Sequence, residues 1–169
     1  MKVMKFGGTS VKDASRIRGL VPILKAEDLS DGLVVVCSAM KGVTDDLIVA
    51  ARKAESGDSS WTGLHAAIVR RHADAVTDLF ASLDNQLWKS IQAKLHELEE
   101  ILHGISLIRE CSDRSMDLVM SFGERLNNEI IAAWFASQGY RASFVDARPL
   151  VLTDGSYGNG AVQFAETYE

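Results

Sequence analysis

The sequence predicts an α/β fold in which helices cover a mainly parallel sheet, with a large helical insertion after the second strand. Short β-branched runs are separated by long stretches in which apolar residues recur at helical spacing. The segment between the first two runs is long enough for a crossover helix, the connection that parallel strands require. With 169 residues, 47% of them apolar and only 2 Pro, the chain has the composition of one ordinary globular domain.

The first βαβ unit is expected at the N-terminus. Residues 3–6 are predicted as its first strand, which ends at Gly7 and Gly8, and residues 33–37 as its second strand. Between them, residues 11–25 carry apolar side chains along one helix face. Because the second run is apolar throughout, we expect parallel strands that are covered on both faces.

Four helices are expected after the second strand. The first spans residues 43–54, and Thr44 is its N-cap candidate, followed by acidic residues in the first turn. The other three are predicted at residues 61–82, 85–110 and 115–137. Their apolar residues recur at spacings of three and four, so we expect those side chains to form the core.

The C-terminal part predicts two further strands and a helix. A strand at residues 142–146 follows Gly139, a natural helix C-cap, and a weaker strand is expected at 149–152. A loop at 154–160 then leads into a helix at 161–169 that has no C-capping signal. A sheet of three or four strands that ends in an uncapped helix predicts a fragment of a longer protein.

Charge and composition exclude several classes of protein. The net charge of −5 argues against a nucleic-acid-binding protein, which needs a basic face. No stretch approaches the ~20 apolar residues of a membrane span, and the N-terminus lacks a signal sequence, so we expect a cytoplasmic protein. Cys37 and Cys111 lack metal or redox spacing and are expected to be reduced core thiols. The four His also lack a metal motif, so no metal site is expected.

The first candidate site lies at the end of the first strand. A lysine there, Lys5, is costly to bury unless an anion compensates its charge. Gly7 and Gly8 would let the backbone approach a ligand, and Thr9 with Ser10 would cap a helix whose N–H groups attract phosphate. A tight turn beside an exposed lysine explains the same residues equally well. The segment matches neither a Walker A loop nor G-x-G-x-x-G.

The second candidate site lies at the end of the second strand. Because ligands bind at the carboxyl ends of parallel strands, Ser38 and Thr44 could donate hydroxyl groups to the same crevice. A turn hydroxyl at Ser38 and a plain N-cap at Thr44 are the alternatives. In the last long helix, Gly123 costs about 1 kcal/mol relative to Ala and indicates close packing or close approach. Glu124 follows it and, taken alone, is interpreted as a solvated helix residue, with Arg125 as its solvent-screened neighbour.

Three segments in order resemble those of aspartate kinases in the amino acid kinase family. The first is the KFGGTSV run at residues 5–11, which is highly specific, the second is residues 36–44, and the third is SFGE at 121–124. Residues 102–107 are similar to a run in bifunctional aspartokinase–homoserine dehydrogenases. Asp146, Arg148, Thr153 and Asp154 are similar to an Asp-x-Arg motif and its following threonine.

The resemblance implies a three-layer α/β/α sandwich and the transfer of phosphate from MgATP to the β-carboxylate of L-aspartate, the first step toward lysine, threonine and methionine. It implies that Lys5, Gly7, Gly8 and Thr9 serve the phosphoryl group. It further implies that Ser38, Thr44 and Glu124 bind aspartate, with the glutamate taking the ammonium group. Phosphoryl transfer depends on positioning and positive charge, which agrees with these residue types.

The resemblance also implies that residues 1–169 form an aspartate-binding lobe, without the nucleotide-binding half and the regulatory domains. ATP and Mg²⁺ would then be cofactors of the complete enzyme, which is expected to be a homo-oligomer. Two alternatives stay open. One is the same lobe of an aspartokinase–homoserine dehydrogenase, and the other is a non-catalytic domain that binds an anion or an amino acid.

Overall fold

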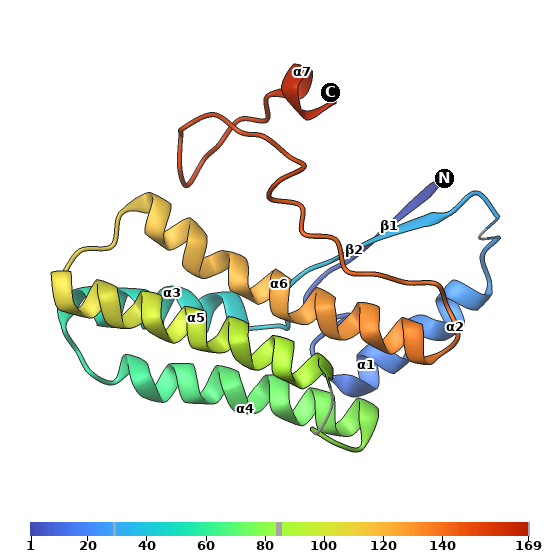
Figure 1. Ribbon diagram of the computed structural model, residues 1–169, viewed down its shortest axis with the longest axis horizontal. Helices are drawn as coiled ribbons and strands as arrows, with labels where there is room; N and C mark the ends of the chain where they lie inside the picture. Colours follow the sequence, from blue (N-terminus) through green and yellow to red (C-terminus); the bar gives the residue numbers. More distant parts are fainter. Residues whose placement is uncertain (29, 84–85, 169) are drawn as a thin grey trace.

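A computed structural model describes residues 1–28, 30–83 and 86–168 and shows a mixed α/β fold (Figure 1). Strands β1 (Lys2–Phe6) and β2 (Leu33–Cys37) pair in parallel, with Lys2 opposite Leu33 and Phe6 opposite Cys37. The parallel pairing predicted for the first βαβ unit is therefore confirmed.

The connection between the two strands holds two short helices instead of the single predicted one. Helix α1 spans Ala14–Arg18 and α2 spans Leu20–Lys25, with Gly19 between them. Pro22 lies in the first turn of α2, where its missing N–H leaves no helical bond unmade. The apolar face predicted for residues 11–25 is buried as expected.

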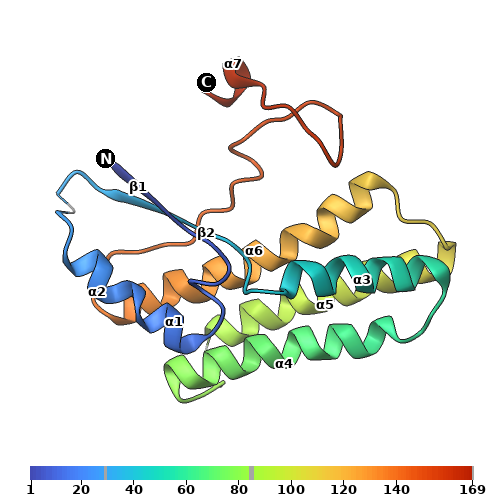
Figure 2. The same ribbon diagram turned by 180° about the vertical axis from the view of Figure 1, so that it is seen from behind.

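The four long helices form one packed body on the same side of the sheet (Figures 1 and 2). They are α3 (Val43–Ser56), α4 (Trp61–Phe80), α5 (Gln86–Ile108) and α6 (Asp113–Ser137). Helix α3 packs against the other three, and α5 packs against α6. The predicted helices are confirmed to within a few residues at their ends, except that Asn85 lies outside the described residues. The leucine and isoleucine stripe of α5 is buried as predicted.

One face of the two-stranded sheet is uncovered in the described part of the chain. Met4 and Phe6 of β1 turn partly inward, whereas Val3, Val34 and Val36 are 64%, 42% and 47% exposed. Successive side chains of a strand point to opposite faces, so a helical layer on one side covers only alternate residues. The expectation that both faces are covered is therefore not met among these residues.

The C-terminal segment differs most from the prediction. Residues 142–146 and 149–152 have no strand pairing, and the described part beyond α6 holds one isolated bridge, between Thr153 and Val162. A strand needs hydrogen bonds from a neighbouring strand, which local sequence preference cannot supply. Gly139 has a φ of 88°, as expected at a helix end. The last helix, α7, is only Phe164–Thr167, and Glu169 of the predicted helix lies outside the described residues.

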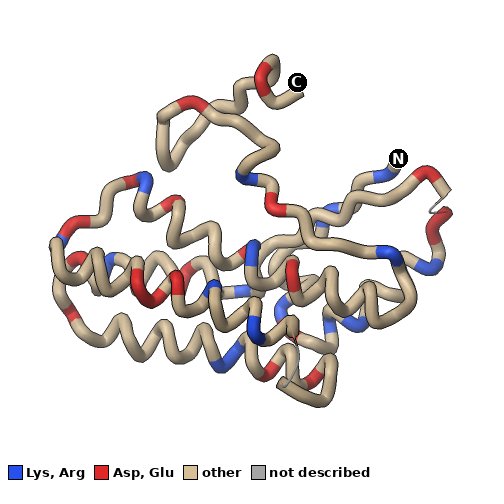
Figure 3. Tube along the Cα trace, viewed as in Figure 1, with Lys and Arg blue, Asp and Glu red and all other residues tan. Residues whose placement is uncertain are grey.

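Figure 3 shows basic and acidic residues interspersed along the chain trace. Cys37 and Cys111 are buried and unpaired, and burial raises the pKa of Cys37 to about 11. His65 and His72 bond to backbone carbonyl groups inside the helical body. Within residues 1–28, 30–83 and 86–168, no helix combines the length and the apolar character needed to cross a membrane.

Candidate functional site

The carboxyl ends of β1 and β2 lie side by side, because the two strands pair in parallel. After β1, Gly7 and Ser10 close a turn in which the Ser10 N–H donates to the Gly7 carbonyl at 2.8 Å. A Cβ atom on Gly8 would lie only 3.0 Å from the carbonyl oxygen of Ala39. This turn therefore packs directly on the loop after β2, which brings the first two predicted site segments together.

Lys5 is exposed. The expectation that it is a buried lysine whose charge needs an anion is therefore wrong. Its side chain projects from the uncovered face of β1, and Nζ lies 4.0 Å from the position of a Cβ on Gly7. Lys5 forms no ion pair with any described residue. The N–H groups of Gly7 and Gly8 donate to no backbone carbonyl in the same part of the chain. A cation and two free N–H groups at one turn can receive an anion.

Thr9 and Ser10 do not cap a helix, so that prediction is wrong. Helix α1 begins four residues later at Ala14, and Asp13 is its N-cap, accepting a hydrogen bond from the Arg16 N–H at 2.9 Å. The N-terminus of α1 is thus already served by a carboxylate of the protein. Thr9 lies exposed in the turn after β1, beside Gly8.

Thr44 is not the N-cap of its helix, which corrects a second prediction. The N-cap of α3 is Gly42, whose φ of 86° lies in the left-handed region that glycine adopts without strain. Thr44 lies inside the first turn, and its Oγ1 is 3.7 Å from the position of a Cβ on Gly123. Arg71 of α4 supports this loop by donating from Nη1 to the Lys41 carbonyl at 2.8 Å. Thr44 therefore faces α6.

At Gly123, α6 packs closely on the loop after β2. A Cβ atom on it would lie 2.8 Å from the Cβ of Ala39 and 3.5 Å from Cδ1 of Leu47. Real Cβ atoms do not come this close, so a larger residue would force the two elements apart. The close packing predicted from a glycine inside a helix is confirmed.

Glu124 follows Gly123 on α6 and bonds to the same loop. Its Oε1 accepts a hydrogen bond from the Ala39 N–H at 3.2 Å. The side chain is otherwise exposed, and Oε2 has no partner among the residues that the structure describes. The carboxylate is therefore anchored by one oxygen and open to a ligand through the other.

Two further residues of α6 hold the end of β2, and the sequence analysis missed both. Asn127 Nδ2 donates to the Ser38 carbonyl at 2.8 Å, and Asn128 Nδ2 donates to the Cys37 carbonyl at 2.7 Å. Asn127 is completely buried. Their spacing of three and four residues from Glu124 places all three side chains on one helix face, a signal present in the sequence.

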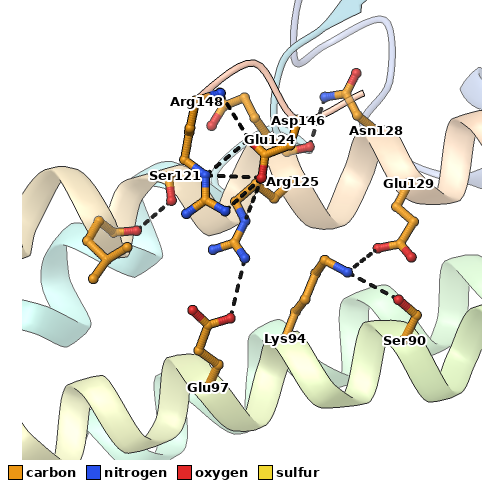
Figure 4. Close-up of polar contacts among 11 residues, drawn as sticks. Ser90, Lys94, Glu97, Ser121, Glu124, Arg125, Asn128, Glu129, Asp146 and Arg148 are labelled. Carbon is orange, nitrogen blue, oxygen red and sulfur yellow. Dashed lines mark hydrogen bonds and ion pairs between the residues drawn. The ribbon is translucent and has the colours of Figure 1, made fainter. Parts of the chain in front are cut away.

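Arg125 is part of a charged network rather than a solvent-screened neighbour of Glu124, which corrects another expectation. Its side chain is 10% exposed, stacks 4.4 Å from the centre of the Phe122 ring and reaches Glu97 of α5 at 3.3 Å (Figure 4). It also lies 3.9 Å from Asp146, which pairs with Arg148 at 2.6 Å. Hydrogen bonds from Arg148 lower the pKa of Asp146 below its usual value. The Asp-x-Arg segment is thus fastened to α6 beside the site.

A shallow groove of about 440 Å³ lies next to these loops, between the start of α1, Met40 and Lys41, and α4. Its lining combines basic and acidic side chains: Lys12, Lys41, Arg71, Asp13, Asp74 and Asp78. None of the predicted site residues lines it. In the described part of the chain, no three His, Cys, Asp or Glu side chains group as metal ligands.

Comparison with known sequences finds a family model and relatives that cover most of this chain. The model of the amino acid kinase family matches residues 1–164. Aspartokinase 1, chloroplastic, of Arabidopsis thaliana is 33% identical over 164 residues, which cover 95% of this chain and 28% of that protein. Bifunctional aspartokinase/homoserine dehydrogenase 1, chloroplastic, of the same plant is 30% identical over 154 residues, covering 89% of this chain and 16% of that protein. The chain thus spans less than a third of these relatives.

Solved structures with a similar fold cover nearly the whole of this chain. Escherichia coli aspartokinase III in complex with aspartate and ADP superposes with a TM-score of 0.87 at 23% identity, covering 99% of this chain and 36% of that chain. The aspartate kinase of Clostridium acetobutylicum gives a TM-score of 0.76 at 22% identity, with 99% and 34% covered. At these identities the likeness shows a shared fold, including the helical body that follows β2.

Proposed function

The chain belongs to the amino acid kinase family, and we propose that it is the aspartate-binding lobe of an aspartate kinase. That enzyme would transfer the γ-phosphoryl group of ATP to the β-carboxylate of L-aspartate. One observation carries the proposal: Glu124 is anchored by the Ala39 N–H beside the turn that presents Lys5 and two free glycine N–H groups. The carboxylate that would bind the amino group and the turn that would bind the anion thus both contact Ala39.

Glu124 would bind the ammonium group of aspartate. Its Oε1 is occupied by the Ala39 N–H, so Oε2 is the oxygen available to a substrate cation. A hydrogen bond between charged groups is about twice as strong as one between neutral groups, so this contact would contribute to affinity and to selectivity for an amino acid. Thr44 and Ser38, both half-buried on the facing loop and helix, would add hydroxyl contacts.

Lys5 would stabilise negative charge on the phosphoryl group as it moves, with the Gly7 and Gly8 N–H groups as further donors and Thr9 beside them. These positions fit a phosphoryl group, because the Lys5 ammonium is unpaired among the described residues and a Cβ on Gly7 would meet only that ammonium within 4 Å. ATP supplies the phosphoryl group in this proposal. Mg²⁺ would enter as the ion that accompanies ATP.

The test uses the complete enzyme, meaning an enzyme that contains this chain together with a nucleotide-binding half. Aspartyl phosphate is trapped as its hydroxamate in the presence of ATP and L-aspartate. We expect hydroxamate formation that depends on both substrates, and none from the 169-residue chain alone, because phosphoryl transfer requires nucleotide and acceptor to be held in line. ATP-dependent hydroxamate formation with glutamate but not with aspartate would refute the proposed substrate.

A bifunctional parent is the second candidate, because relatives with and without a homoserine dehydrogenase both match nearly the whole chain. Homoserine-dependent reduction of NADP⁺ by the complete enzyme would identify it. The cytoplasmic location and the homo-oligomeric state stay predictions, which fractionation and light scattering of the complete enzyme would check.

A further inference from the structure

Two asparagines of α6 hold Cys37, the last residue of β2, and Ser38, which follows it. Asn128 bonds both polar groups of the Cys37 backbone: Nδ2 donates to the carbonyl at 2.7 Å and Oδ1 accepts from the N–H at 3.3 Å. Its Nδ2 also donates to the Glu124 carbonyl at 2.8 Å (Figure 4). Asn127 Nδ2 donates to the Ser38 carbonyl at 2.8 Å. The Asn128 amide thus replaces, at one residue, the pair of hydrogen bonds that a neighbouring strand would form.

The next backbone group along the chain binds the candidate substrate ligand. The Ala39 N–H donates to Glu124 Oε1 at 3.2 Å. This N–H follows directly after the two residues that the asparagines fix, so its direction depends on their position. We propose that Asn127 and Asn128 are positioning residues, which fix the end of β2 so that the Ala39 N–H holds the Glu124 carboxylate toward the substrate. The inference rests on the proposed function, which assigns Glu124 to the ammonium group of aspartate.

The burial of Asn127 indicates that its amide does more than fill space. The side chain is completely buried, and its Oδ1 has no hydrogen-bond partner among the described residues. An unpaired buried acceptor lowers stability, whereas an apolar side chain of the same shape would remove that penalty. Packing alone therefore favours leucine at this position, and the hydrogen bond to Ser38 is what the amide adds.

The first experiment measures hydrogen exchange of backbone amides in the 169-residue chain. Asn127→Leu removes the donor to the Ser38 carbonyl, and Asn128→Asp removes the donor to the Cys37 carbonyl. The aspartate also places a negative charge beside two carbonyl oxygens. We expect the Ala39 amide to exchange about tenfold faster in each variant, the factor that corresponds to one hydrogen bond of ordinary strength. Asn159→Asp makes the same charge change in an exposed loop and should leave Ala39 unchanged.

Exchange at Leu98 and Leu102, both buried in α5, reports on the fold as a whole. These amides should keep their wild-type protection when Ala39 loses it. Equal loss at all three amides would show that the variants only destabilise the protein, and unchanged protection at Ala39 would show that it does not depend on the asparagines. Either result overturns the proposal. If Asn128→Asp does not fold, Asn127→Leu alone decides.

The second experiment compares two ligands in the complete enzyme. Succinate has both carboxylates of aspartate but no ammonium group, so its inhibition constant does not depend on the direction of Glu124. We expect Asn127→Leu to raise the KM for aspartate about tenfold while the succinate constant and the KM for ATP change less than twofold. A parallel rise for aspartate and succinate, or a fall in kcat alone, would contradict a positioning role. If the wild-type enzyme forms no aspartyl phosphate, the proposed function fails, while the exchange measurement still decides whether the asparagines hold Ala39.

Discussion

Replacing Gly123 by alanine tests the contact that brings α6 onto the loop after β2. Alanine is favoured over glycine inside a helix by about 1 kcal/mol. Against this, the new Cβ would lie 2.8 Å from the Ala39 Cβ, with Leu47 and the Thr44 hydroxyl close behind it. All three neighbours belong to packed elements, so α6 or the loop must move. Overpacking of this kind costs about 1–3 kcal/mol. We therefore expect Gly123→Ala to lower the free energy of unfolding by about 0–2 kcal/mol.

Gly104 provides a matched control, because it lies inside α5 and a Cβ on it would meet nothing within 4 Å. Gly104→Ala should therefore show the helix preference alone and stabilise the protein by about 1 kcal/mol. Urea denaturation of both variants and the wild type measures the difference, expected at about 1–3 kcal/mol. If Gly123→Ala stabilises the chain as much as Gly104→Ala does, the close approach to Ala39 is not a constraint and the reasoning fails.

Three further outcomes are expected. In the complete enzyme, Lys5→Ala should lower kcat on the order of 10²–10³ with little change in the aspartate KM, because its charge acts on the transferring phosphoryl group; a near-normal kcat would leave Lys5 as an exposed strand residue. Glu124→Gln should raise the aspartate KM about 10–100-fold and leave the ATP KM and Tm unchanged, since only a charge is removed; equal effects on both substrates would reject its assignment to the ammonium group. Burial lowers the pKa of His72 from 6.5 to about 4, so the unfolded chain binds the proton first and stability should fall as the pH falls from about 6.5 to about 4. This dependence should be weaker in His72→Phe when Tm is followed against pH.

Local sequence signals were sufficient for the helices, the first strand pair and the motif positions. Apolar residues at helical spacing predicted α3 to α6 almost to their ends, because burial of one helix face decides those segments. Gly123 was recognised as a contact point because glycine is unfavourable inside a helix without a packing reason. The two strands were recognised from short β-branched runs, and a connection that held a helical segment implied their parallel pairing.

Helix caps and strand pairing depend on which groups become neighbours, and only the tertiary structure shows them. Thr9, Ser10 and Thr44 are plausible N-caps by residue type, but the backbone path places Asp13 and Gly42 at the N-termini of α1 and α3. The strand expected at residues 142–146 has the right composition and no hydrogen-bonded neighbour among the described residues. Strand pairing is a long-range property, so the sequence of one segment does not determine it.

In the candidate site, too, the sequence indicates the chemical groups and the tertiary structure determines where they lie. Residue types in the sequence predicted Lys5 and Gly8 as groups able to bind an anion, and the family resemblance implied a substrate-binding role for Glu124. Folding decided that Lys5 lies on an exposed face, and that Asn127 and Asn128 hold the end of β2 where the Ala39 N–H meets Glu124. The sequence by itself determines which chemical groups a chain can offer, whereas distances between groups 85 or more residues apart depend on how the helices and strands pack.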